Sequence, residues 1–356
     1  MTRPSTGRVA PEPRRTTGVP ALGQQTVGEP RTARIAVDLL GGDQAPAVVV
    51  DGALRACQAD PSLHLLLVGP VDAAGAVLGA LDPADHARVG TLPVPHERTG
   101  KRSDQRGGER SAESWVESGV RTAVLAVAQG LADAVVSAGN TGATVTSAAL
   151  GLGRWPGVRR PPLAAVLPTG TGRLVLLDVG SSVDPDEQTL AMHARLGAAY
   201  AAVVHEIARP RVGLLTIGTE RGKGDRLRRA LPPILARLDL PVGARYAGLV
   251  EGNDVVLGTV ADVVVTDGFT GNILLKGLET AYATIGAPRA APPDVPPRAA
   301  ILLGVSGIVV VCHGSASGPD VAAGIALAAH LHRRGAVAAI AAVLPKNAIP
   351  HNEVSP

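Results

Sequence analysis

Aromatic side chains are nearly absent from this 356-residue chain, which holds 2 Trp, 3 Tyr and 1 Phe. Hydrophobic residues still make up 46% of it, so the core of any domain must be built from Val, Leu, Ala and Ile. Proteins that bind single-stranded nucleic acids stack the bases on aromatic rings. The scarcity of such rings therefore argues against a nucleic-acid partner.

Cysteine is also scarce, because Cys57 and Cys312 are the only two and both lie in apolar runs. They are typical of buried free thiols rather than of a disulfide framework. No His, Cys and Asp residues recur at the spacing of a metal site, so the sequence predicts no metal and no other cofactor. Free thiols fit a reducing compartment, and we expect a cytoplasmic protein.

No apolar run reaches the roughly 18 residues that a transmembrane helix needs. Residues 1–32 are rich in Pro, Arg, Thr and Gly without an apolar period, which predicts a disordered basic tail. This tail lacks the apolar segment of a secretory signal, although its Arg-rich composition leaves an organellar transit peptide open. We expect its deletion to leave folding and activity intact. Residues 33–335 form the predicted α/β domain, followed by a C-terminal segment, 336–356.

Short β-branched runs alternate with helical patterns from residue 34 onward. The expected strands are 35–37, 63–68, 89–94, 134–136, 163–167, 174–177, 212–217, 246–250, 263–266 and 307–311. This alternation predicts a three-layer α/β/α fold with a mostly parallel sheet. Six of the loops that follow these strands combine Gly with Asp, Asn, Ser or Lys. Because parallel strands end at the same edge, we expect all six loops to line one cleft for anions and a polar acyl substrate.

The stretch 263–277, V-V-V-T-D-G-F-T-G-N-I-L-L-K-G, shows this design most clearly. It predicts a buried strand, a glycine-rich turn and a helix whose first N–H groups converge on an anion. Lys276 adds a cation about one turn into that helix. The plain alternative is a tight turn followed by a solvated lysine.

The sequence contains none of the common nucleotide-binding or serine-hydrolase motifs. The chain has no phosphate-binding G-x-x-x-x-G-K-[ST], no G-x-G-x-x-G after its first strand and no G-x-S-x-G nucleophile elbow. The polar loop 95–112 is typical of a solvated segment, and a lid over an active site is the alternative.

Seven loop motifs occur in a recognisable order. They are V-D-L-L-G-G-D-Q-A-P, V-S-A-G-N-T-G-A, L-D-V-G-S-S-V-D, I-G-T-E-R-G-K-G, V-E-G-N-D, D-G-F-T-G-N-I-L-L-K and H-G-S-A. In this order and spacing, over residues 34–335, the chain resembles the bacterial phosphate acyltransferase of fatty acid and phospholipid synthesis. The resemblance implies transfer of a fatty acyl group from acyl carrier protein to inorganic phosphate, which gives an acyl phosphate. It also implies a phosphotransacetylase- and isocitrate-dehydrogenase-like fold and a homodimer.

Phosphate is already an anionic nucleophile, so such a site must mainly hold it against the thioester and stabilise the oxyanion that forms. The candidate catalytic residues are Lys276, Asn272, His313 and Asn140. His313 is the best acid/base candidate, and a hydrogen-bonded structural histidine is the alternative. The carboxylates orient other groups or cap helices. The candidate substrate-binding residues are Asp38, Gly41, Gly42, Asp43, Ser137, Gly139, Thr141, Gly142, Asp178, Gly180, Glu220, Lys223, Gly224, Glu251, Asn253, Asp267, Gly268, Thr270 and Gly271.

The chain departs from the family pattern in four places. Ser181-Ser182 stands where the family has Ala-Asn, Thr219-Glu220 replaces paired acids, and Ser118-Gly119 replaces a serine pair. The interval Leu278 to Ile301 contains five prolines where the family forms a projecting helical pair, which predicts little affinity for membranes. These departures leave open a divergent paralogue that uses acyl-CoA, and a degenerate binding protein without turnover.

Overall fold

The computed structural model describes residues 32–94, 107–220, 222–286 and 298–345; within 107–117 it describes the backbone only. Most of the predicted basic tail and of the polar loop 95–112 lies outside the described residues. So does the proline-rich stretch 287–297. The expectations for a disordered tail, a lid and a non-helical proline segment therefore remain predictions.

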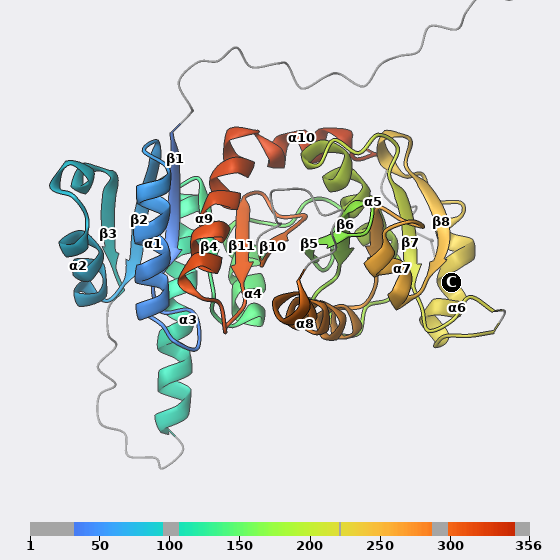
Figure 1. Ribbon diagram of the computed structural model, residues 1–356, viewed down its shortest axis with the longest axis horizontal. Coiled ribbons are helices and arrows are strands. Elements are labelled where there is room, and N and C mark those ends of the chain that lie inside the picture. Colours follow the sequence, from blue (N-terminus) through green and yellow to red (C-terminus); the bar gives the residue numbers. More distant parts are fainter. Residues whose placement is uncertain (1–31, 95–106, 221, 287–297, 346–356) are drawn as a thin grey trace, which may run out of the picture. The chain divides into compact units, whose positions relative to one another are not determined.

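Eleven strands form a single mixed sheet among the described residues (Figure 1). Their order across the sheet is β3-β2-β1-β4-β11-β10-β5-β6-β9-β7-β8. β-branched and leucine side chains fill both faces of the central strands, as expected for strands covered by helices on each side. The strands are β1 (Ala33–Asp38), β2 (Leu63–Gly69), β3 (Val89–Pro93), β4 (Ala134–Ser137), β5 (Leu163–Thr169), β6 (Gly172–Leu177), β7 (Arg211–Leu215), β8 (Arg245–Val250), β9 (Val263–Val265), β10 (Ala299–Leu302) and β11 (Ile308–Cys312).

The sense of the strands reverses in the middle of the sheet. Seven neighbouring pairs are parallel, but β10 is antiparallel to β11 and to β5, and β5 is antiparallel to β6. The pairing sense of β6, β7, β8 and β9 is therefore opposite to that of β1, β4 and β11. The sheet is also strongly twisted, and α4, α7 and α8 lie along the same side of the molecule in Figure 1. The expectation that all six loops line one cleft remains a prediction.

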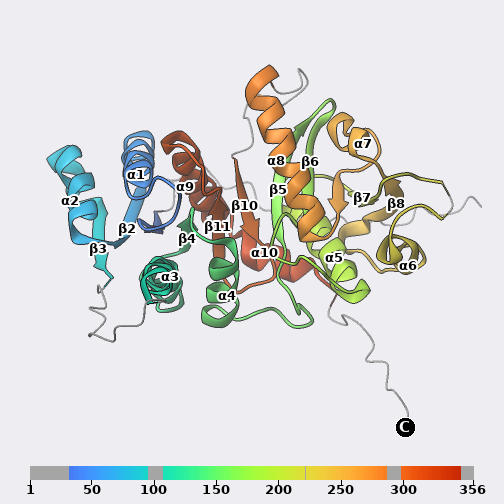
Figure 2. The same cartoon turned by 90° about the horizontal axis from the view of Figure 1, so that it is seen from below.

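Helices cover both faces of the sheet (Figure 2). One apolar core includes side chains of α1, α2, α5, α6, α9 and α10, and the other includes those of α3, α4, α7 and α8. The arrangement confirms the predicted three-layer fold. The helices are α1 (Ala47–Ala59), α2 (Val71–Ala80), α3 (Gly107–Ala128), α4 (Thr141–Gly151), α5 (Glu187–Val204), α6 (Arg226–Leu235), α7 (Gly252–Leu257), α8 (Gly268–Ile285), α9 (Gly318–Arg333) and α10 (Ala336–Val343), with short 3₁₀ turns at Pro83–Arg88 and Pro241–Gly243.

The sequence missed one central strand and several helices. β10 is only four residues long and follows a proline-rich segment, so its A-A-I-L pattern gave no period to recognise. α4 and α7 begin within predicted loops. α10 lies in the C-terminal segment, which the sequence left without a structure, and it buries Ala336 and Ile340 in the core. None of the described helices is long and apolar enough to cross a membrane.

Candidate functional site

A buried carboxyl group marks the end of β1. Asp38 is 1% exposed and accepts hydrogen bonds from the Ser137 hydroxyl at 2.8 Å and from the Leu40 N–H at 3.1 Å. Burial raises the pKa of Asp38 to about 6, although these two hydrogen bonds act in the opposite direction. Ser137 ends β4, so this contact fastens the loop after β1 to the loop after β4.

The start of α4 lies beside this contact. The Asn140 side chain caps the helix by accepting the Ala143 N–H at 3.0 Å, and Gly139 N–H donates to the Ser137 hydroxyl. Among the described residues, the N–H groups of Asn140, Thr141 and Gly142 have no hydrogen-bond partner. They are the free donors that a helix start offers to an anion. Asn140 is exposed, so this start is open to solvent.

The loop after β11 joins the same group. The Asp43 N–H donates to the Gly314 carbonyl at 2.7 Å, which connects this loop to the glycine-rich loop after β1. His313 begins the loop, and its Nε2 lies 2.9 Å from a carboxylate oxygen of Glu279. Both side chains are largely buried, at 20% and 10% exposure. We name Asp38 to Asp43, Ser137 to Gly142, His313 and Gly314 the first loop group.

Glu279 is a functional candidate that the sequence analysis missed. It lies in α8, which follows β9. Asn272, Lys276 and Glu279 are spaced i, i+4 and i+7, which places them along one side of the helix. This polar row on an otherwise apolar helix is the signal that could have revealed Glu279. Lys276 itself is exposed.

Two N–H groups at the N-terminus of α8 have partners within the protein. The Gly268 N–H donates to the Ser182 carbonyl at 2.7 Å, and the Thr270 N–H donates to the Asp267 carboxylate at 2.8 Å. A side chain at Gly271 would collide with the Asp178 carbonyl. The helix start therefore packs against the loop after β6, and the N–H groups of Gly268 and Thr270 are used inside the protein. The expectation that this turn receives an anion remains a prediction.

Asp178 organises that loop from a fully buried position. Its carboxylate accepts the N–H groups of Leu163, Gly180, Ser181 and Ser182 and the Ser181 hydroxyl, at 2.7 to 3.1 Å. The Ser181 hydroxyl oxygen also lies 2.6 Å from the Pro161 carbonyl oxygen, so its single proton is shared between Asp178 and Pro161. Ser181, one of the departures from the family pattern, is therefore committed to holding the loop. The Asn272 amide donates to the Val179 carbonyl at 2.9 Å from the same side.

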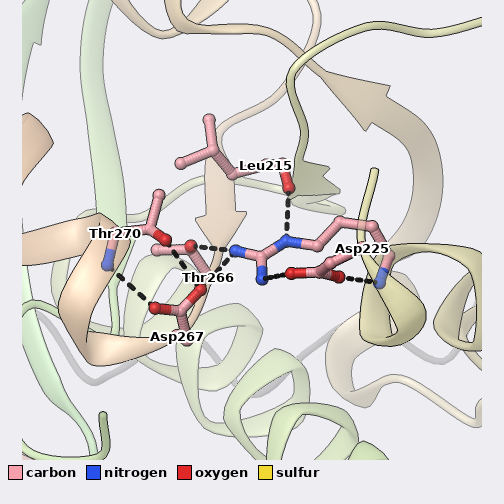
Figure 3. A network of polar contacts seen from close by, with 6 residues as sticks. Leu215, Asp225, Thr266, Asp267 and Thr270 are labelled. Atoms are coloured by element: carbon pink, nitrogen blue, oxygen red, sulfur yellow. Dashed lines mark hydrogen bonds and ion pairs between the residues drawn. The ribbon is translucent and has the colours of Figure 1, made fainter. Parts of the chain in front are cut away.

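A buried arginine of α6 links the end of β7 to the start of α8 (Figure 3). Arg228 of α6 donates to the Leu215 carbonyl, to Asp225, to the Thr266 hydroxyl and to Asp267. Burial alone would raise the pKa of Asp267, but the hydrogen bonds from Thr270 and Arg228 bring it below its ordinary value. Asp267 therefore acts as a helix cap and ion-pair partner. The sequence gave Arg228 no role, since it lies one turn into a helix beyond the glycine-rich loop.

The remaining candidates lie in the loops after β7 and β8. Glu220 and Lys223 are exposed, and the Lys223 N–H donates to the Glu220 carbonyl at 3.1 Å. Glu251 caps α7 in a reciprocal pair with Asp254, and Asn253 is exposed. These loops border a cavity of about 530 Å³ that Gly224, Arg228 and Thr270 also line. We name the loops after β6, β7, β8 and β9 the second loop group, with members Asp178, Gly180, Glu220, Lys223, Gly224, Glu251, Asn253, Asp267, Gly268, Thr270, Gly271 and Asn272.

The two groups offer different chemistry. The first has unpaired N–H groups, a buried carboxyl group and a histidine held by a glutamate. The second has its central carboxylates saturated by donors. In the part of the chain that the structure describes, no three His, Cys, Asp or Glu side chains are placed to hold a metal ion.

Comparison with known proteins agrees with this fold and these motifs. A family model described as "Fatty acid synthesis protein" matches residues 33–288. The phosphate acyltransferase of Thermobifida fusca is 38% identical over 83% of this chain and 87% of its own length, and that of Brevibacillus brevis is 40% identical over 71% and 72%. A phosphotransacetylase structure from Streptococcus pyogenes covers 85% of this chain and 94% of its own, with a TM-score of 0.55 and 21% identity, a similarity of fold. The chain is thus an acyltransferase and belongs to the phosphate acyltransferase family.

Proposed function

We propose that this enzyme transfers a fatty acyl group from acyl-acyl carrier protein to inorganic phosphate. The products are an acyl phosphate, which serves phospholipid synthesis, and the free thiol of the carrier. Family membership supports the transfer to phosphate. The carrier protein as donor rests on the resemblance of the loop motifs.

The observation that carries the proposal is the open start of α4 beside the His313–Glu279 pair. Among the described residues, the N–H groups of Asn140, Thr141 and Gly142 have no hydrogen-bond partner, and three such donors offer a dianion more than a lysine alone would. The helix dipole adds a partial positive charge at the same point. We place the phosphate there, within the first loop group.

The reaction needs little more than positioning. A phosphate oxygen attacks the thioester carbon, the carbonyl oxygen becomes an oxyanion, and the C–S bond then breaks. The proton of hydrogen phosphate ends on the departing thiolate, whose conjugate acid has a pKa near 8.5 by analogy with cysteine. His313 is suited to carry that proton, because Glu279 at 2.9 Å fixes its ring. Lys276, one turn before Glu279, supplies a mobile positive charge.

The second loop group supports this site from a distance. Because α8 starts against the Asp178 loop and contacts His313 through Glu279, it spans the two groups. About eight residues separate Gly271 from Glu279, or about 12 Å along the helix. The saturated contacts around Asp178 and Asp267 therefore fix the position of Glu279. In this scheme Asn272 and Asp267 are positioning residues.

The test is direct. The full-length protein is incubated with phosphate and either palmitoyl-acyl carrier protein or palmitoyl-CoA, and the acyl phosphate is trapped with hydroxylamine. Faster turnover of the carrier-protein thioester supports the proposal, and a preference for CoA identifies the divergent paralogue. No acyl phosphate from either donor, with phosphate binding retained, would identify a degenerate binding protein. A reaction mixture without the protein is the control for non-enzymatic transfer.

The proposed partners are acyl carrier protein, phosphate and a second copy of this chain. We propose a cytoplasmic enzyme without a cofactor and without nucleic acid. We also propose weak or no association with membranes. Co-sedimentation with anionic liposomes at physiological salt tests the last point, and pelleting of a variant that lacks residues 1–32 would contradict it.

A further inference from the structure

A second cavity lies on the face of the sheet opposite α4 and α8. Its volume is about 520 Å³, within the range of small-molecule sites. Strands β5 and β10 form its floor, and helices α5 and α9 form its walls. α10 packs on both of these helices. The residues of the proposed acyl-transfer site do not line it.

The cavity has an apolar interior. Ala164 and Val166 of β5, Ala299 of β10, Val204 of α5 and Leu327 of α9 supply methyl and methylene groups. Ala323 and Ala326 precede Leu327 on the same side of α9, and their small side chains keep the wall open. A volume lined in this way suits an alkyl chain.

Four basic side chains surround the same cavity: Arg173, His205, His330 and Arg334. The one acidic residue that lines it, Glu206, pairs with Arg334 at 2.6 Å. Glu206 is 71% exposed, so solvent screens this ion pair and weakens it. An anion that enters the cavity can replace Glu206 at the guanidinium at little cost.

His205 also indicates that the cavity can hold a hydrogen-bond acceptor. Its Nε2 is buried and has no hydrogen-bond partner among the described residues. The ring packs edge-on against Tyr200, with centroids 5.0 Å apart. Burial lowers the pKa of His205 to about 4, and the positive charges of Arg173, His330 and Arg334 act in the same direction. Buried polar atoms normally have partners, and an anion would supply one here.

We propose that this cavity binds a single-chain amphiphile with an anionic head, the head lying against His205 and Arg334 and the alkyl chain over Ala164, Val166 and Leu327. A carboxylate and a phosphate monoester share the required chemistry. A fatty acid and an acyl phosphate are therefore the two sources to distinguish. The site goes beyond the proposed acyl transfer and does not depend on it.

The experiment measures equilibrium binding to the full-length protein without acyl donor or phosphate. Titration calorimetry with dodecanoate, dodecyl phosphate, dodecanol and dodecyltrimethylammonium, each below its micelle concentration, separates the contributions of head and chain. We expect both anions to bind at least about 10-fold more tightly than the alcohol, and the cation not to bind. The ratio of the two anions identifies the preferred head.

Variants locate the site. Arg334→Gln and His205→Asn should each weaken anion binding about 10-fold, and Ala326→Phe should block it by filling the mouth. Ala326 is exposed, so this substitution leaves the core intact. Arg237→Gln, an exposed arginine that lines neither described cavity, is the matched control. His313→Gln should bind the anions like the unchanged protein.

Three results would overturn the proposal. The first is equal affinity for the anions and the alcohol. The second is unchanged anion binding in Arg334→Gln and Ala326→Phe, with melting temperatures that show folded variants. The third is a dimer, seen by light scattering, that Ala326→Phe dissociates while no amphiphile binds, which would make the cavity an interface between copies.

Discussion

Helices α4 and α8 begin with similar sequences but differ in the hydrogen bonds made by their first N–H groups. Each follows a buried strand through a glycine-rich turn, S-A-G-N-T-G-A before α4 and D-G-F-T-G-N before α8. Among the described residues, the N–H groups of Asn140, Thr141 and Gly142 at the start of α4 have no hydrogen-bond partner, whereas the Gly268 N–H of α8 donates to the Ser182 carbonyl. A glycine-rich helix start is therefore a potential anion site only when the neighbouring loop leaves its donors unused.

The two buried aspartates near these helix starts show the same contrast. Asp38 has a hydroxyl and an N–H as donors, and burial raises its pKa to about 6. Asp267 has an arginine and two donors from Thr270, and its pKa falls below the ordinary value. Burial disfavours the charged form in both, and the number of donors decides the outcome. Asp38 is thus the side chain closer to a change of protonation near neutral pH.

The largest expected effect is on stability, at the second loop group. Arg228→Met removes the partner of Asp267 and leaves a buried carboxylate without its cation. We expect the free energy of unfolding to fall by about 3 kcal/mol, as for other buried ion pairs that lose one member. Urea denaturation measures it. Asp267→Asn in the Arg228→Met background should recover part of the loss.

Arg226→Met is the matched control, on the same helix. Its ion pair with Glu187 is solvent-exposed, with 75% of the arginine side chain accessible. The free energy of unfolding should change by no more than about 0.5 kcal/mol. Equal losses in the two variants would contradict the assignment of Arg228 as the residue that links the end of β7 to the start of α8.

The next effect concerns Asp38 and pH. Its folded pKa, about 6, is above the ordinary value of 3.8. The favourable contribution of this group is complete below about pH 4 and is lost as the pH rises through 6. Asp38→Asn removes that dependence. The stability of Asp38→Asn relative to the unchanged protein should therefore rise by about 2 kcal/mol from pH 4.5 to pH 7.5.

Chemical denaturation at the two pH values measures this difference directly. Because both proteins share every other titrating group, the difference isolates Asp38. Asp72→Asn, an exposed aspartate in the first turn of α2, is the control. A pH-independent difference between Asp38→Asn and the unchanged protein would show that the carboxyl group is already ionised throughout this range.

The sequence predicted the layers of the fold and most of the strands, because buried β-branched runs and glycine turns are local signals. It failed on the antiparallel strands in the middle of the sheet. β10 is antiparallel to both of its neighbours, so β11 and β5 run in the same sense, and the β5–β6 pair then reverses the sense for β6, β9, β7 and β8. No local pattern encodes the pairing of β10 with distant strands, whereas the two-residue turn Gly170-Thr171 between β5 and β6 is a local hairpin signal that was missed.

For the candidate site, the sequence predicted which residues are candidates better than it predicted the contacts that they make. Asn140 remains an exposed candidate, and His313 remains a largely buried candidate held by Glu279. The Asp267 carboxylate accepts hydrogen bonds from Arg228 and Thr270. Gly271 packs against the Asp178 carbonyl. Glu279 needed the structure, since only folding brings it 2.9 Å from a histidine 34 positions away.

A third prediction tests whether α8 connects the two groups functionally. Glu279→Gln should lower kcat about 10-fold with little change in either KM, because the ring of His313 loses its carboxylate partner but keeps its place. His313→Gln should lower kcat about 100-fold, the lower range for a general acid or base. Steady-state kinetics measures both, with Glu187→Gln as the control.

The double variant sharpens this result. If Glu279 acts through His313, Glu279→Gln adds nothing once His313 is glutamine, so the two losses should not add. Additive losses would mean that Glu279 acts on its own or through the fold. Circular dichroism and the melting temperature check the fold of each variant.

The smallest expected effect compares two exposed lysines. Lys276 precedes Glu279 by one turn of α8, whereas Lys223 lies in the loop after β7, within the second group. Lys276→Ala should raise the KM for phosphate about 3- to 5-fold and change the KM for the acyl donor less, since an exposed charge contributes under about 1 kcal/mol. Lys276→Arg should rescue poorly, because a guanidinium needs a different pocket shape from an ammonium. Lys223→Ala should leave the phosphate KM unchanged, because the proposed phosphate site lies in the first loop group. A larger effect at Lys223 than at Lys276 would place phosphate at the second loop group and reverse the assignment of the two helix starts.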